Sequence, residues 1–228
     1  MSRIAKLFTA LTTLTVLCGS ILVYATAQQG DRLSLDGKEY FIYTNPLAPY
    51  LQDHPDKLPK ADVVSTGLWR GYVASWKVEN GRFFLVDVSI LKSVSKPGER
   101  DSSIELSSVM STMFPGEPEV LASWFSGYVI VPNGKLANHV HMGYASTYEK
   151  YILLKVEKGV VTRKWTADTK TFIKFRNAQF SAYKKTEEYR KALAETSKEG
   201  TMSPEQNAEF LREYYSERYM SMIFDEPK

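Results

Sequence analysis

Cysteine is almost absent from this sequence: Cys18 is the single one among 228 residues, and it lies in an apolar stretch near the N-terminus. A disulfide within one chain needs two cysteines, so none can form. If the N-terminal stretch is removed, the chain that remains has no thiol to act as metal ligand or nucleophile. Its stability must then come from a packed core alone.

The net charge of the sequence is also small. The formal net charge is +3, and removal of Arg3 and Lys6 with a leader lowers it to +1. A nucleic-acid partner requires clustered basic residues, which a nearly neutral chain does not supply. No polybasic amphipathic helix follows the leader. We therefore expect no nucleic-acid partner and no membrane insertion after signal cleavage.

Sequence motifs of the common enzyme classes are missing. There is no Gly-x-Ser-x-Gly elbow, no His-Glu-x-x-His helix and no phosphate-binding glycine loop. The 13 glycines stand singly at apparent turns. These absences predict no cofactor and favour a non-enzymatic protein.

The first 27 residues are typical of a secretory leader. Arg3 and Lys6 give a basic start, residues 7–23 are mostly apolar, and Ala25-Thr26-Ala27 offers small residues before a cleavage site at Gln28. This pattern predicts a signal peptide over residues 1–27 and a periplasmic or secreted protein. The alternative is an uncleaved anchor in the inner membrane, because the apolar run approaches the length of a membrane span.

Residues 28–228 are predicted to form a single α+β domain, mainly β over 28–165 and mainly helical over 166–228. Turn signals predict an antiparallel sheet built from hairpins. The apolar strand at 82–91 is expected to be central in that sheet. The hairpin turns are expected at Asp36-Gly37, Asn80-Gly81, Asn133-Gly134 and Lys158-Gly159.

Capping signals place the helices. Ser102-Ser103-Ile104-Glu105 matches a capping box and predicts one inserted helix that ends at Pro115-Gly116. Ser203-Pro204-Glu205-Gln206 predicts the start of a C-terminal helix. That helix is expected to pack on the sheet through one apolar face, formed by Leu211, Tyr215, Tyr219 and Met222, with Glu209, Glu213 and Glu217 facing outward.

His139 and His141 are the sharpest candidates for a chemical site. Two residues apart on a strand, they are expected to project to the same face. That spacing suits zinc or copper, with His54 or Glu149 as a further ligand, although two histidines alone define no particular metal. The alternative is a solvated or hydrogen-bonded pair on a polar sheet face.

The stretch from Tyr144 to Tyr151 follows directly. Tyr144 and Tyr148 bring rigid aromatic area with a hydroxyl group, and Glu149 adds a carboxylate. With His139 and His141 they form the predicted binding site. The alternative is that they are ordinary strand and loop aromatics.

Four phrases carry a resemblance: residues 68–74 (LWRGYVA), 85–88 (LVDV), 124–127 (WFSG) and above all 139–149 (HVHMGYASTYE). Together they resemble a family of uncharacterised bacterial proteins over roughly residues 33–185. The resemblance implies a bacterial origin. It carries over no activity and no functional residue.

These observations predict an exported envelope protein that acts as a non-enzymatic binding or interaction module, with a protein partner in the envelope. An immunity protein that blocks a toxin is one example. The alternative is a periplasmic hydrolase or metal-dependent enzyme that uses the His139 and His141 region.

Overall fold

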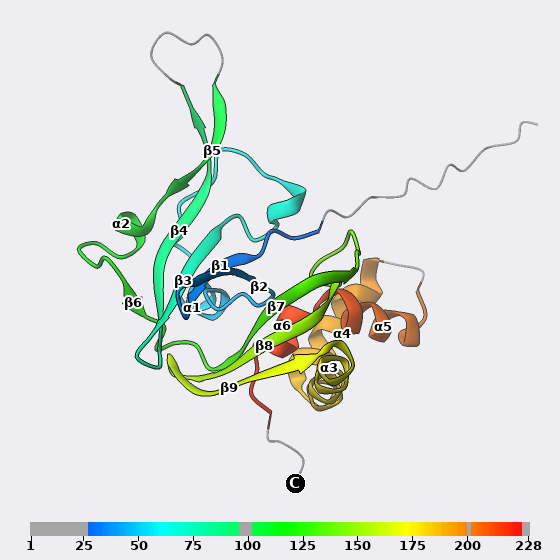
Figure 1. Ribbon diagram of the computed structural model, residues 1–228. Coiled ribbons are helices and arrows are strands. Elements are labelled where there is room, and N and C mark those ends of the chain that lie inside the picture. Colours follow the sequence, from blue (N-terminus) through cyan, green and yellow to red (C-terminus); the bar gives the residue numbers. More distant parts are fainter. Residues whose placement is uncertain (1–26, 96–101, 200–201, 225–228) are drawn as a thin grey trace, which may run out of the picture.

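The computed structural model describes residues 27–95, 102–199 and 202–224 (Figure 1). Of the predicted leader, residues 1–27, all but Ala27 lies outside the described residues. The fold is mixed α/β, with a nine-stranded, mostly antiparallel sheet. Among the helices of the described ranges, none has the length and apolar character needed to span a membrane.

The strands account for most of the first two thirds of the chain. They are β1 (Asp31–Leu35), β2 (Lys38–Ile42), β3 (Val73–Glu79), β4 (Arg82–Val94), β5 (Ser103–Ser108), β6 (Val120–Leu121), β7 (Gly127–Asn138), β8 (Thr147–Glu157) and β9 (Val160–Asp168). The helices are α1 (Ala48–Asp53), α2 (Met110–Met113), α3 (Thr169–Tyr183), α4 (Glu187–Glu199), α5 (Pro204–Tyr214) and α6 (Ser216–Met220), with a 3-10 turn η1 at Thr66–Leu68.

The main path of the sheet runs β2-β1-β3-β4-β9-β8-β7, and β1 with β3 is its parallel pair. The sheet curls so far that the two ends of this path meet. The N–H of Tyr43, just after β2, donates to the carbonyl of Ile130 in β7 at 2.8 Å. β4 pairs with β3, β5, β6 and β9, so the predicted central strand is confirmed.

The pairing between the ends of β2 and β7 extends over few residues, and the sequence of β7 explains why. Two residues beyond Ile130, where an antiparallel ladder would bond again, stands Pro132, which has no N–H to donate. The register of β7 against β8 then shifts between Asn133 and Leu136. The two sheet edges therefore separate after Ile130 and leave a gap.

Residues on the two faces of the curled sheet enter different cores. Ile152 and Leu154 of β8 join a cluster that also contains Leu33 of β1, so this cluster fills the concave side. Their neighbours Tyr151 and Leu153 point to the opposite face. There α3 and α6 cover β7, β8 and β9 (Figure 1). Burial on both faces explains the continuous apolar character of this strand.

The turn chemistry of two segments follows their sequence. Asn80 and Gly81 adopt positive φ angles of 51° and 72° between β3 and β4, as an Asn-Gly pair favours. Ser203 and Gln206 form a complete capping box at the start of α5.

The predicted inserted helix is wrong over most of its length. Residues 103–108 form β5, which pairs with β4, and Ile104 is 48 % exposed. Only one helical turn, α2, follows, and it buries Met110 and Met113. The long strand β4 needs a partner along its second edge. Pairing with that edge outweighs a local capping signal worth about 1 kcal/mol.

The predicted hairpin at Asn133-Gly134 is also wrong. β7 continues through both residues to Asn138, and Gly134 takes a φ of +82° inside an irregular stretch of the strand. The Asn-Gly pair therefore accommodates a bulge, which needs the same positive φ as a turn. β7 ends at Asn138 and β8 begins at Thr147, so His139 and His141 do not lie on a strand.

The prediction of a single C-terminal helix is also wrong. The segment forms two helices, because α5 ends at Tyr214 and α6 begins at Ser216. All four predicted residues, Leu211, Tyr215, Tyr219 and Met222, still pack in the second core. The predicted outward position of Glu217 is wrong, since one of its carboxylate oxygens is shielded from solvent.

Candidate functional site

His139 and His141 lie in the loop between β7 and β8 and are both exposed. Their rings contact each other: the ring centroids are 4.3 Å apart, and His139 Nε2 lies 3.3 Å from His141 Nδ1. The sequence predicted that the two side chains would be close, although through a strand rather than a loop.

In the described part of the chain, no third metal ligand lies near them. Within the described ranges, no group of three or more His, Cys, Asp or Glu side chains is placed to hold a metal ion. The carboxylate of Glu149 accepts from the Lys135 N–H at 3.2 Å, at the bulge of β7. The ring of His54 packs against Tyr50 in α1 at 4.6 Å. The predicted set is therefore not assembled in this part of the chain.

We expect the double variant His139→Ala with His141→Ala to melt at the wild-type temperature, because both rings are exposed and contribute little burial. Circular dichroism melts measure this directly. A clear fall in melting temperature would show that the pair has a structural role.

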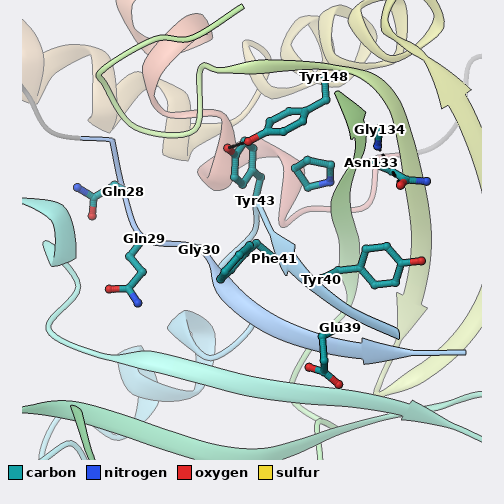
Figure 2. A pocket seen from close by; sticks show the side chains of 11 residues that line it. Gln28, Gln29, Gly30, Glu39, Tyr40, Phe41, Tyr43, Asn133, Gly134 and Tyr148 are labelled. Carbon is teal, nitrogen blue, oxygen red and sulfur yellow. Dashed lines mark hydrogen bonds between the residues drawn. The ribbon is translucent and has the colours of Figure 1, made fainter. Parts of the chain in front are cut away.

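The other predicted residues, Tyr144 and Tyr148, both contact Tyr43, which the sequence analysis did not single out. Tyr43 stacks on Tyr144 with ring centroids 4.8 Å apart, and packs edge-on against Tyr148 at 5.9 Å. The hydroxyl groups of Tyr43 and Tyr148 are hydrogen-bonded at 3.0 Å (Figure 2). This tyrosine cluster brings together β2, β8 and the β7–β8 loop, with one cavity beside Tyr148 and another beside Tyr144.

The first cavity, which we call the seam, has a volume of about 440 Å³ and lies where β2 and β7 separate (Figure 2). Phe41, 58 % exposed, stands in it, and Pro132 and Asn133 form the β7 side. The seam is thus the direct result of the interrupted closure of the sheet.

The second cavity, which we call the cleft, has a volume of about 530 Å³. It lies between the segment after η1, the β7–β8 loop and the α5–α6 region. Trp69, 78 % exposed, is its most accessible aromatic side chain. The cleft is lined by Gln28, Asn45, Trp69, Arg70, Met142, Gly143, Tyr144, Phe210, Tyr214, Tyr215, Glu217 and Arg218.

A buried ion pair lies behind the cleft. Arg70 donates to Asp31 at 2.6 Å, and the Asp31 side chain is fully buried. The two Asp31 oxygens also accept from the Ala74 N–H and from the Trp76 indole N–H, each at 3.0 Å. Burial raises the pKa of Asp31, and the Arg70 charge and these hydrogen bonds oppose that rise. The pair fixes the Arg70 guanidinium at the cleft wall.

Arg70 also links the pair to the predicted site. Its second terminal nitrogen donates to the Tyr144 hydroxyl at 2.5 Å, and that hydroxyl donates to Asn45 Oδ1 at 2.9 Å. Burial raises the pKa of Tyr144 above its ordinary value. The phenol is therefore neutral at physiological pH, and its hydroxyl group links Arg70 to Asn45 through hydrogen bonds.

Glu217 is the acidic group of the cleft. Burial raises the pKa of its carboxyl group to about 7, while a backbone hydrogen bond at Glu217 and the charges of Arg218 and Arg70 act in the opposite direction. Its Oε2 is shielded and has no hydrogen-bond partner among the described side chains and backbone. Glu217 also lines the cleft, so the charge of its carboxylate acts on a molecule bound there.

The sequence missed most of this cleft. Trp69 and Arg70 stand out in the sequence only as part of the phrase at residues 68–74, and Asp31 gives no signal at all. Glu217 fell on a regular acidic stripe that implied solvent exposure. Only an acidic residue within an aromatic-rich stretch, Tyr214 to Tyr219, pointed to something other than a solvated face.

Comparison with known proteins adds no identification. No protein-family model matches the chain, and searches of curated proteins and of solved structures found no significant similarity. The resemblance drawn from the four sequence phrases therefore remains a prediction.

Proposed function

We propose that the protein is an exported bacterial envelope protein that acts as a non-enzymatic binding module, with the cleft as its binding site. The proposal takes residues 28–228 as one domain that is periplasmic or secreted after removal of residues 1–27. Its partner is a protein of the envelope that inserts a side chain into the cleft.

The observation that supports it is the composition of the cleft. Binding surfaces are enriched in Trp, Tyr and Arg, because these side chains bury large rigid areas and still form hydrogen bonds. Here an exposed Trp69 stands beside Arg70, which the buried Asp31 holds in place. Exposing 78 % of an aromatic side chain to water is unfavourable, and a partner that covers Trp69 would remove that exposure.

The alternative function, a hydrolase or metal-dependent enzyme, uses His139 and His141. The contact between the two rings fits either function, but the described ranges supply no third ligand. We therefore keep this alternative as one outcome of the test below.

We expect wild-type protein isolated from the bacterial envelope to retain its partner, and Trp69→Ala to retain at least tenfold less. Loss of an aromatic side chain at the centre of an interface costs more than about 1.4 kcal/mol, which is a factor of ten in affinity. Quantitative mass spectrometry of the co-purified proteins measures the difference. Val64→Ala is the matched control, because Val64 is 90 % exposed and does not line the cleft.

Equal retention by Trp69→Ala and wild type would reject the cleft as the binding site. Stoichiometric zinc or copper in the same preparations, lost in the double histidine variant, would support the enzyme instead.

A further inference from the structure

The fold engages the acidic group of the cleft only in part, through a backbone hydrogen bond at Glu217 itself. Glu217 Oε2 has no hydrogen-bond partner within the described ranges. By contrast Glu213, four residues earlier, lies 3.1 Å from Arg176 and 3.0 Å from Arg212. A shielded carboxylate oxygen without a donor is costly, and proteins retain few of them without a reason.

The two arginines whose charges act on Glu217 have partners of their own, although Arg70 Nε is buried without one in the described part of the chain. Arg70 donates to Asp31, Tyr144 and the carbonyl of Gln29. The Arg218 guanidinium lies over the Tyr215 ring at 4.9 Å and reaches Glu195 at 3.7 Å. Both arginines therefore have other acidic partners, and their charges also act on Glu217, which is the one carboxylate among the described residues that line the cleft.

Aromatic side chains line the same cleft as Glu217. Phe210 lies 5.3 Å from Tyr214 and 5.5 Å from Tyr215, measured between ring centroids, and all three line the cleft with Trp69. Aromatic faces attract cations, and a carboxylate beside them supplies the counter-charge. The volume of about 530 Å³ accommodates more than a single side chain.

We propose that the cleft recognises a protonated amine or guanidinium group, with Glu217 as its counter-ion and the aromatic side chains as its walls. This rests on the proposed function, in which the cleft is the binding site, and it assigns the inserted group to a lysine or arginine side chain of the partner. A small free amine has the same chemistry and is distinguished by the experiment.

Binding of a cation should depend on pH. Glu217 is largely protonated below its pKa of about 7 and must ionise to bind the cation. The groups that face it are Arg70 and Arg218, which stay charged, and the phenols of Tyr144, Tyr183 and Tyr219, which stay neutral. Affinity should therefore fall by up to tenfold per pH unit as the pH drops below 7, and level off above it.

The test uses the full chain and isothermal titration at pH 8 and pH 5.5. The probes are doubly blocked lysine and arginine, putrescine as a small amine, blocked norleucine as the neutral probe and blocked glutamate as the anionic one. We expect the cationic probes to bind at least tenfold more tightly than norleucine at pH 8, and to lose that advantage at pH 5.5.

Glu217→Gln should remove the preference for cations, because it keeps the size of the side chain and loses the charge. Glu209→Gln is the matched control: Glu209 is 56 % exposed, pairs with Arg212 and lies outside the cleft. This variant should bind as wild type. Preference for blocked lysine and arginine over putrescine supports a protein side chain, and the reverse overturns that assignment in favour of a small amine.

Thermal melting tests the burial of the Glu217 carboxyl group independently of probe binding. Burial raises the pKa of Glu217 in the folded chain, so the carboxyl group favours folding at low pH and opposes it as the pH rises through 7. Glu217→Gln should therefore melt above wild type at pH 8 and close to it at pH 5.

Equal binding of norleucine and lysine, tighter binding of glutamate, or identical melting of Glu217→Gln and wild type at pH 8 would each overturn the cation site. If Trp69→Ala still loses the partner in that case, the proposed function stands and only the nature of the inserted group is wrong.

Discussion

Replacement of Arg70 by Met should lower the free energy of unfolding by about 3–5 kcal/mol, measured by urea denaturation at pH 8. The substitution removes the charge that faces Asp31, whose side chain is fully buried, and leaves that carboxylate with two neutral donors. The loss should be smaller at pH 4. Without Arg70 the pKa of Asp31 rises further, and the protonated carboxyl group is cheaper to bury.

Two further variants make the interpretation of Arg70→Met specific. Adding Asp31→Asn should restore part of the lost stability, because the buried charge is then gone. Arg190→Met removes an arginine whose partner is the exposed Glu187, and should change the unfolding midpoint very little. Similar losses for Arg70→Met and Arg190→Met would show that the ion pair behind the cleft contributes no more than a surface pair.

Leu211→Asp should destabilise the protein by more than about 3 kcal/mol. Leu211 is 1 % exposed and packs in the core between the helices and the sheet. The substitution removes buried apolar area and places a carboxylate there without a partner. The unfolding midpoint in urea measures the effect.

Leu136→Asp is the control for Leu211→Asp, because Leu136 in β7 is 48 % exposed and the same change there removes little burial. An unchanged midpoint for Leu211→Asp would mean that α5 contributes nothing to the stability of the sheet.

The sequence predicted the parts of the fold that depend on local chemistry. The Asn80-Gly81 turn and the Ser203 capping box are decided by a few neighbouring residues. The prediction failed where a distant strand decides the outcome. Residues 103–108 take their conformation from the edge of β4, and Asn133-Gly134 bends a strand whose partner is β8. A single sequence does not show such partners.

The candidate site was predictable only in part. Tyr144, in the β7–β8 loop, and Tyr148, in β8, each line a cavity. Asp31 and Arg70 are 39 positions apart, and Glu217 comes from the opposite end of the chain. Their juxtaposition results from the curl of the sheet and the return of the C-terminal helices, which no short motif encodes.

The incomplete closure at Pro132 has a consequence for solubility. A free strand edge is a template onto which another molecule can add a strand, and long open edges promote aggregation. In this protein the outer edges of β2 and β7 line opposite sides of the seam. Each edge therefore faces the other across the seam, which leaves less room beside it for a strand added by another molecule. The seam stays open, because Pro132 has no N–H to donate and Phe41, which stands in the gap, is 58 % exposed.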